Sequence, residues 1–292
     1  VAGGVGPLAG GGGRAAPTHV PAVLRSDPPV TVRQLLAHTS GIYDESNGIE
    51  SQDQLEADIA ALADPALRAE AQTALAQALA GKPVIASDRL LVALSETHPR
   101  YFAPGTGYHY SNTNYQLAAM VLEKATGTPL ADLLRTRIVD PLGLERTTIA
   151  PPDTASPELR GYGTSTADGS LVDLTDDLTW FGNGGNGGII STPDELLAMM
   201  QAIVGGRLLP PELVAEMRSP TSMSLGSYGL GLATYSFSCG TFYGHEGGVN
   251  GTASIAIVSP DGADGVVIAL NLRSGEDPRL PALADLMLCG ER

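Results

Sequence analysis

The chain has little positive charge and no long apolar run. Its 292 residues include 17 Lys and Arg against 32 Asp and Glu, a formal net charge of -15. A negative field of that size repels nucleic acid and anionic membrane surfaces, so no nucleic-acid partner is expected. No stretch of about 18 apolar residues occurs, so no transmembrane segment is predicted.

The N-terminus also lacks the features of an export signal or of a packed element. Residues 1–6 hold neither a basic n-region nor an apolar stretch, so the sequence shows no signal peptide. Residues 1–16 are rich in Gly and Ala, with four glycines in a row at 10–13. Such a composition buries too little apolar surface to offset the entropy of ordering it, so a loose arm is predicted.

Cysteine is scarce as well. Only Cys239 and Cys289 occur, and neither belongs to a Cys-x-x-Cys pair or a Cys/His cluster. No metal site is therefore predicted. No cofactor is expected either. Composition leaves two interpretations open for this pair. The two residues form a bridge between the C-terminal helix and the sheet, which implies an oxidising compartment, or they are two buried thiols.

The first half of the chain carries helical patterns. Thr31 is placed to cap a short helix. Residues 52–98 have apolar side chains at helical spacing, and further helices are expected over 115–125 and 130–139. With 43% hydrophobic residues the chain can bury a large core, so residues 17–165 are predicted to form a mainly helical lobe.

The second half changes to short β-rich runs separated by turn residues. A helix opened by Thr192 precedes these runs, and a helix over 281–289 follows them, so a sheet-plus-helix lobe is predicted over 166–292. The fold class is therefore α+β, one two-lobed unit with a site between the lobes. The four expected strands are 228–235, 241–246, 251–259 and 265–272.

Several common catalytic motifs are absent. Residues 182–187 match G-x-G-x-x-G, but no strand precedes them and no helix follows, so they do not predict a nucleotide site. The sequence contains no G-x-S-x-G motif, and the pair His245-Glu246 has no second His one helical turn later. These absences argue against α/β-hydrolase and zinc-protease chemistry.

Five stretches, taken in their order along the chain, carry a family resemblance. They are Thr31-Val32-Arg33-Gln34-Leu35-Leu36-Ala37-His38-Thr39-Ser40-Gly41, Tyr110-Ser111-Asn112-Thr113-Asn114-Tyr115, Pro141-Leu142-Gly143-Leu144, Tyr228-Gly229-Leu230-Gly231-Leu232 and Gly244-His245-Glu246-Gly247-Gly248. In these stretches the chain resembles the serine D-alanyl-D-alanine carboxypeptidase and class C β-lactamase family of penicillin-binding hydrolases. The resemblance extends from about Val20 to the end of the chain.

The resemblance implies properties that composition alone does not give. It implies a β-lactamase/DD-peptidase-like fold, a helical lobe beside an antiparallel sheet flanked by helices, and hydrolysis through an acyl-enzyme. It also implies an extracytoplasmic or secreted location and a peptide-like, β-lactam or ester small molecule as the ligand. A monomer is expected. Cys239 and Cys289 are similar to the disulfide-bearing positions of secreted DD-peptidases, which implies that they form a bridge.

The resemblance also assigns roles to single residues. Tyr110 is expected to transfer the proton between the serine nucleophile and the leaving group, and Asn112 to hold the substrate amide. His245 is expected to shape the electrostatics beside Tyr110, and the backbone N–H of Gly248 to stabilise the oxyanion.

Three further residues are expected to bind substrate. Trp180 lies in a segment similar to one that lines the cleft of DD-peptidases, and it is expected to form an apolar wall unless it is an ordinary core Trp. Glu246 and Gly247 are expected to lie in the strand that borders the substrate.

One element of the family pattern is missing. The family nucleophile belongs to a Ser-x-x-Lys motif, but the only lysines are Lys82 and Lys124, preceded three residues earlier by Leu79 and Val121. Residues 1–292 on their own are therefore predicted to be inactive. One hypothesis is that the sequence is N-terminally truncated or frameshifted upstream of residue 17. The other is that the chain is a pseudoenzyme, a binding-only relative.

Two departures from the family pattern concern the substrate. Ala233 stands where DD-carboxypeptidases carry an arginine for the terminal carboxylate of the substrate, and loss of that arginine removes a strong charge-assisted contact. Glu246 and Gly248 replace two threonines, and Glu246 adds a negative charge. These changes argue against strict D-Ala-D-Ala carboxypeptidase specificity. Esterase, amidase or D-amino-acid peptidase activity on less acidic substrates is expected at least as much as carboxypeptidase activity.

Overall fold

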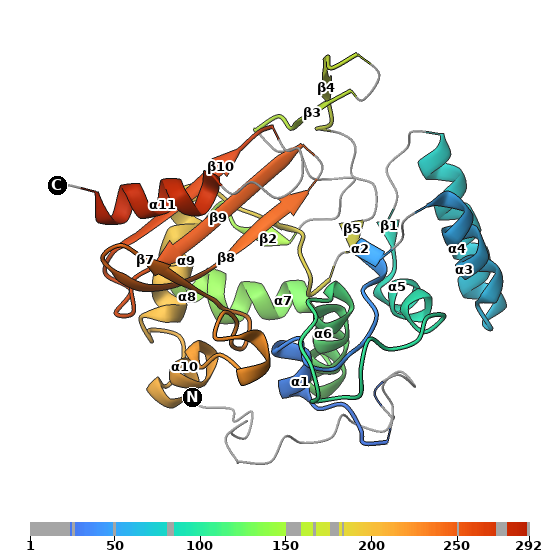
Figure 1. Ribbon diagram of the computed structural model, residues 1–292, viewed down its shortest axis with the longest axis horizontal. Coiled ribbons are helices and arrows are strands. Elements are labelled where there is room, and N and C mark those ends of the chain that lie inside the picture. Colours follow the sequence, from blue (N-terminus) through green and yellow to red (C-terminus); the bar gives the residue numbers. More distant parts are fainter. Residues whose placement is uncertain are drawn as a thin grey trace.

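The fold consists of a helical lobe beside a sheet lobe, as Figure 1 shows for this computed structural model. The structure describes residues 24, 27–48, 51–80, 85–149, 159–165, 168–175, 181–182, 184–249, 251–272 and 279–290. The predicted loose arm, residues 1–16, lies outside the described residues. No helix in the described part of the chain is long and apolar enough to cross a membrane.

The helical lobe begins where the sequence places helix caps. The Thr31 side chain accepts a hydrogen bond from the Gln34 N–H, and the Gln34 side chain accepts one from the Thr31 N–H, which confirms the predicted start of α1. Gly127, in a left-handed conformation, ends α6. The helices of this lobe are α1 (Val32–Leu36), α2 (Glu45–Gly48), α3 (Gln52–Ala61), α4 (Pro65–Leu79), α5 (Asp88–Ser95), α6 (Asn112–Thr126) and α7 (Leu130–Leu134).

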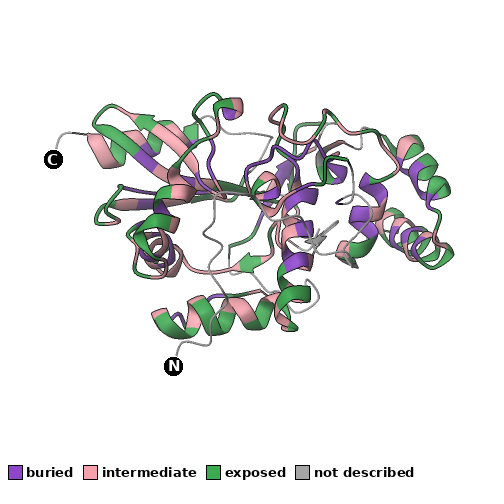
Figure 2. Cartoon of the chain, turned by 90° about the horizontal axis from the view of Figure 1, so that it is seen from below, coloured by how far each residue is buried: buried purple, intermediate pink, exposed green. Residues whose placement is uncertain are grey.

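Two apolar clusters hold the helical lobe together. In one, Leu90, Leu91 and Leu94 of α5 pack against buried side chains of α3 and α4, such as Leu55 and Leu67. The second cluster joins α1, α5 and α6. It contains Leu35 of α1, Val92 of α5, and Leu117 and Val121 of α6. Figure 2 shows buried positions gathered on the inner faces of these helices. Helix α5 therefore contributes to both clusters.

The sheet lobe is built on a four-stranded antiparallel sheet in the order β10-β9-β8-β7. Helix α11 (Arg279–Cys289) covers one face, where Leu280 and Ala284 pack on Ile255 and Ile257. Helix α9 (Pro193–Val204) covers the other face, where Met200 and Val204 pack on Ala256 and Val258. The strands are β7 (Ala233–Phe237), β8 (Gly240–Val249), β9 (Thr252–Val258) and β10 (Gly265–Leu270).

Short elements complete the fold. Strand β1 pairs in parallel with β5, and the antiparallel pairs β2 with β6 and β3 with β4 complete the small sheets. The remaining elements are β1 (Ile85–Ala86), a π-helical turn (Arg135–Val139), α8 (Asp140–Leu142), β2 (Thr148–Ile149), β3 (Tyr162–Thr164), β4 (Leu171–Asp173), β5 (Phe181–Gly182), β6 (Ile189–Ile190), α10 (Pro211–Arg218) and a 3-10 turn (Ser222–Ser224).

One predicted strand is wrong at its start. The sequence favours a strand over 228–235, but β7 begins only at Ala233. Residues 228–232 form a loop because Gly231 has a positive φ of 76° and the backbone of Gly229 lies against the carbonyl of Met217. The loop carries Tyr228 out of the sheet and toward the helical lobe.

The disulfide implied by the family resemblance is present. Cys239, in the turn between β7 and β8, is bonded to Cys289 at the end of α11, with an S–S distance of 2.03 Å. The bond therefore joins the tip of a hairpin to the C-terminal helix that covers the sheet. The alternative of two buried thiols is wrong.

Candidate active site

The loop 104–111 and the first turn of α6 form one wall of the candidate site. Ser111 is the N-cap of α6, but its side chain does not cap the helix; its hydroxyl donates instead to the carbonyl of Tyr43, at 3.3 Å. Tyr110 precedes the cap and is 37% exposed, while Asn112 is the first residue of the helix. The predicted motif Tyr110-Ser111-Asn112 thus lies at a helix start, with Tyr110 partly exposed.

His38, at the end of α1, lies directly beneath this loop. Its Nδ1 atom accepts hydrogen bonds from the backbone N–H of Ser111, at 3.1 Å, and from the side-chain amide of Asn114, at 3.2 Å. Because Nδ1 faces two donors, the neutral imidazole carries its hydrogen on Nε2. The His38 side chain is 0% exposed.

Aromatic rings surround His38. The ring of Tyr110 lies 4.1 Å from the imidazole between centroids, at an angle of 31°. The rings of Tyr228 and Tyr115 follow at 4.9 and 5.1 Å, and that of Tyr108 at 6.3 Å. In a chain with only 5% aromatic residues, this gathering of rings marks the junction of the lobes.

The sheet lobe reaches this cluster through Tyr228 and His245. The Tyr228 hydroxyl lies 3.0 Å from Nε2 of His245, which is carried by β8. The other ring nitrogen of His245 donates to the carbonyl of Glu246, at 2.5 Å. The rings of Tyr110 and His245 are 6.1 Å apart. Tyr110 and His245, expected to act side by side, thus come from different lobes and meet at the same site.

Burial dominates the electrostatics of the cluster. Burial raises the pKa of Tyr110 to about 12, and the charge of Asp44 and the phenol of Tyr108 add to the effect. Burial likewise raises the pKa of Tyr228. For His38 burial lowers the pKa to about 3, because charging an enclosed imidazole near His245 and His109 is unfavourable. At neutral pH these tyrosines are phenols and His38 is neutral.

The other predicted site residues lie along β8 or outside the described part. Gly247 shares a strand face with His245, whereas Glu246 and Gly248 point to the opposite face, because side chains alternate along a strand. The carboxylate of Glu246 accepts a hydrogen bond from the Tyr235 hydroxyl, at 3.2 Å. Gly248 lies toward the exposed end of β8. Trp180 lies outside the described residues.

Sequence reasoning did not single out His38 or Tyr228. Both lie inside stretches that carry the family resemblance, but no spacing rule connects them with Tyr110. Ser111 and His38, for example, are 73 positions apart. The only sequence signal is the concentration of aromatic residues at Tyr108 and Tyr110 around His109, in a chain poor in aromatics.

The glycine-rich segment packs on the helices behind the site. A Cβ atom on Gly185 would lie 2.1 Å from the carbonyl oxygen of Tyr115, so the loop backbone contacts α6 directly. A Cβ atom on Gly184 would lie 2.3 Å from a carboxylate oxygen of Asp88. Burial, together with the charge of Glu123, raises the pKa of Asp88 to about 6. Glycine is required here for close approach, as in loops that line sites.

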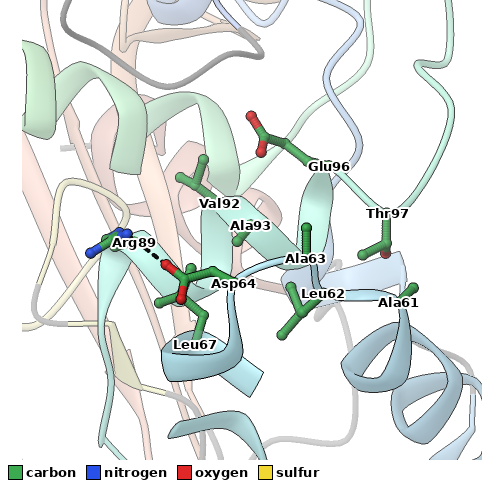
Figure 3. A pocket seen from close by; sticks show the side chains of 10 residues that line it. All are labelled: Ala61, Leu62, Ala63, Asp64, Leu67, Arg89, Val92, Ala93, Glu96 and Thr97. Carbon is green, nitrogen blue, oxygen red and sulfur yellow. Dashed lines mark hydrogen bonds and ion pairs between the residues drawn. The ribbon is translucent and has the colours of Figure 1, made fainter. Parts of the chain in front are cut away.

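A separate cavity of about 430 Å³ lies between α5 and the α3–α4 connection (Figure 3). An ion pair between Arg89 and Asp64, at 2.8 Å, stands at its edge. None of the rings described above, those of His38, His245 and the four tyrosines around His38, lines this cavity. The lining residues are Ala61, Leu62, Ala63, Asp64, Leu67, Arg89, Val92, Ala93, Glu96 and Thr97. Within the described ranges no group of three or more His, Cys, Asp or Glu side chains could hold a metal ion.

Comparison with known proteins identifies the family. The Beta-lactamase family model matches residues 14–287, so the chain belongs to the Beta-lactamase family. D-aminopeptidase of Brucella ovis is 32% identical over 168 residues, which cover 56% of this chain and 31% of that protein. The chain therefore spans less than a third of the length of the curated relatives that it matches.

Solved structures show the same fold. A D-stereospecific amidohydrolase from Streptomyces sp. is 31% identical, with a TM-score of 0.73 over 93% of this chain and 77% of that one. The D-amino acid amidase from Ochrobactrum anthropi SV3, complexed with L-phenylalanine amide, is 26% identical, with a TM-score of 0.61 over 84% and 65% of the two chains. The predicted α+β, β-lactamase/DD-peptidase-like fold is confirmed.

Proposed function

We propose that this chain forms the substrate cleft of a serine hydrolase that cleaves amides or peptides of D-amino acids through an acyl-enzyme. The observation that carries the proposal is the meeting of Tyr110 with His245 and Tyr228 at the junction of the lobes. The relatives support the substrate class, because the three named above are a D-aminopeptidase, a D-stereospecific amidohydrolase and a D-amino acid amidase.

Tyr110 is the proposed proton carrier. In the acylation step a serine oxygen attacks the substrate carbonyl, its proton passes to Tyr110, and Tyr110 returns a proton to the leaving nitrogen as the C–N bond breaks. With a pKa of about 12, Tyr110 is almost entirely protonated at neutral pH, and only its phenolate can accept the serine proton, so a neighbouring cation has to lower that pKa. Residues 1–292 contain no Ser-x-x-Lys motif to provide the serine and the cation.

The departures in β7 and β8 favour a substrate without a terminal carboxylate. Ala233, which replaces the carboxylate-binding arginine of DD-carboxypeptidases, pairs with Gly244 next to His245 in the sheet. Glu246 adds a negative charge one residue further on. A neutral amide at the scissile end suits this environment better than a carboxylate, because no arginine is left at this position to pair with a carboxylate.

The test is acylation and turnover. Residues 1–292 alone are expected neither to be labelled by a fluorescent penicillin nor to hydrolyse D-phenylalanine amide. A chain extended upstream by a segment with Ser-x-x-Lys is expected to do both, and to prefer the D-amide over the L-amide at least tenfold. Labelling of residues 1–292 alone would contradict the claim that these residues lack the serine nucleophile. An extended chain that prefers a D-Ala-D-Ala carboxylate substrate would overturn the proposed specificity.

A second candidate is a binding protein that keeps the cleft and performs no chemistry. The observation that favours it is the absence of Ser-x-x-Lys from these residues. In that case the chain binds a D-amino acid amide reversibly, with Tyr110, Asn112 and Trp180 as contacts. Calorimetry with D-phenylalanine amide distinguishes the candidates: saturable binding by residues 1–292, lost in Tyr110→Ala, favours the binding protein.

The location and the oligomeric state belong to the proposal as well. A disulfide between Cys239 and Cys289 is compatible with an oxidising, extracytoplasmic compartment. A monomer is expected, and light scattering coupled to gel filtration tests it. A mass above that of one 30.0 kDa chain would contradict the monomer.

A further inference from the structure

We propose that His38 is a positioning residue that fixes the ring of Tyr110 in the cleft. The role of Tyr110 in proton transfer rests on the function proposed above, whereas the positioning itself rests only on geometry. The Tyr110 ring is partly exposed and lies at the end of a loop, so something has to hold its orientation. Three sets of contacts from His38 do so.

The first contacts hold the backbone on both sides of Tyr110. The carbonyl oxygen of His38 accepts the N–H of His109, at 3.1 Å, and the imidazole Nδ1 accepts the N–H of Ser111, also at 3.1 Å. Residues 109 and 111 are thus both bound to the same residue. Tyr110 between them cannot rotate its backbone without breaking one of these bonds.

The second contact is the ring itself. The imidazole of His38 lies 4.1 Å from the Tyr110 ring between centroids, closer than the Tyr228 and Tyr115 rings that pack around the same imidazole. Aromatic rings in contact stabilise one another beyond the burial of their area. The imidazole therefore packs against one face of the Tyr110 ring and limits its rotation.

A third set of contacts keeps the imidazole in place. The side-chain amide of Asn114 donates to Nδ1 of His38, and its oxygen accepts a hydrogen bond from the Ser40 hydroxyl, at 2.5 Å. The Ser40 oxygen in turn accepts the N–H of Ile42, at 3.1 Å. His38 Nε2 has no hydrogen-bond partner among the described residues. Two donors on Nδ1 fix the ring, and they require that His38 stays neutral.

The backbone of His38 argues against a merely structural turn residue. His38 has a φ of 53°, in the left-handed region that favours Gly and Asn. Asn would fit that backbone with less strain, and its side-chain oxygen could still accept the Ser111 N–H. What Asn cannot provide is the ring. A His at this position is therefore explained by its contact with Tyr110.

The experiment is NMR of the chain labelled with 13Cζ-tyrosine, with Tyr110→Phe to assign the Tyr110 resonance. In His38→Asn the cooperative unfolding transition is expected to stay, while the titration of Tyr110 moves down by about one pH unit because the phenol is less enclosed than in the wild type. His98→Asn is the matched control. His98 stacks on Tyr43 at 4.0 Å, so its replacement should alter Tyr43 and leave Tyr110 unchanged.

Two results would overturn the proposal. The first is a Tyr110 titration in His38→Asn that equals that of the wild type. The second is seen in the wild-type chain, without any variant. Strong nuclear Overhauser contacts are expected between the His38 and Tyr110 rings, and their absence would contradict the proposal. Neither measurement requires an acyl-enzyme, so loss of the proposed hydrolase function would leave this test intact. If His38→Asn does not fold, the wild-type measurement alone decides.

Discussion

The hydroxyl of Tyr228 and the Nε2 atom of His245 lie 3.0 Å apart, although one residue belongs to a loop and the other to strand β8. Tyr228→Phe removes this hydrogen bond and leaves the ring. The free energy of unfolding is expected to fall by about 1–2 kcal/mol, because a part-buried hydrogen bond is lost. Denaturant titration measures the change.

Tyr243→Phe is the control for that change. Tyr243 lies two residues before His245 on β8, and its ring packs under Arg218, at 5.2 Å, a contact that Phe can keep. Its replacement is expected to change stability by less than about 0.5 kcal/mol. Equal losses in the two variants would show that the hydrogen bond to His245 contributes nothing.

Acid is expected to destabilise the fold through His38. Its pKa in the folded chain, about 3, is below its ordinary value of 6.5, so the folded state favours the neutral ring. This contribution is fully present above pH 6.5 and is lost as the pH falls toward 3, with a slope of at most about 1.4 kcal/mol per pH unit. Urea unfolding at several pH values measures the slope, which should decrease in His38→Asn.

The Asp88 carboxyl is expected to stabilise the fold in acid, opposite to the effect of His38. Its pKa is raised from 3.8 to about 6, so the folded state favours the protonated carboxyl. The corresponding stability is present below pH 3.8 and is lost as the pH rises through 6. Asp88→Asn removes this opposing contribution, so its loss of stability between pH 6 and pH 4 should be steeper than that of the wild type. A shallower loss would refute the assignment.

Two glycines of one loop should respond differently to alanine. In Gly185→Ala the new Cβ would lie 2.1 Å from the Tyr115 carbonyl oxygen, so the loop has to move away from α6. A loss of about 1–3 kcal/mol is expected, as for overpacked sites. Around Gly187 nothing lies within 4 Å of such an atom, so Gly187→Ala should change stability by less than about 0.5 kcal/mol. Thermal unfolding of both variants makes the comparison.

Reduction of the Cys239–Cys289 bond should destabilise the sheet lobe. The bond closes a loop across a sequence separation of 50, for which chain-entropy arguments give about 4 kcal/mol. The unfolding midpoint should therefore fall when dithiothreitol is added. The double variant Cys239→Ser/Cys289→Ser should show the lower midpoint and no response to the reductant. A wild-type unfolding midpoint that is the same with and without dithiothreitol would contradict the prediction.

Elements with local signals could be predicted from the sequence. Thr31 and Thr192 each accept a hydrogen bond from the third residue of the following helix, and the glycine at 127 stops α6, all as expected. These features depend on neighbouring residues only. The start of β7 could not be predicted in this way, because the contact of Gly229 with Met217 depends on the packing of the loop against α10.

The candidate site was accessible to sequence reasoning only in part. Tyr110 and His245 were found because they lie in family motifs, and the structure brings them together. His38 and Tyr228 contribute through contacts between segments that are distant in the chain. Such contacts leave no periodic pattern, and a buried neutral His looks like any other core His before its partners are known.

The carbonyl oxygen of Leu36 accepts one hydrogen bond from each lobe, so motion between the lobes can be followed at this atom. It accepts the hydroxyl of Tyr115, at 2.8 Å, within the helical lobe, and the N–H of Gly231, at 3.3 Å, from the loop before β7. The amide hydrogen of Gly231 can exchange with solvent deuterium only when that second bond opens. Its exchange rate therefore reports how often the two lobes separate, and a ligand that bridges them should slow it.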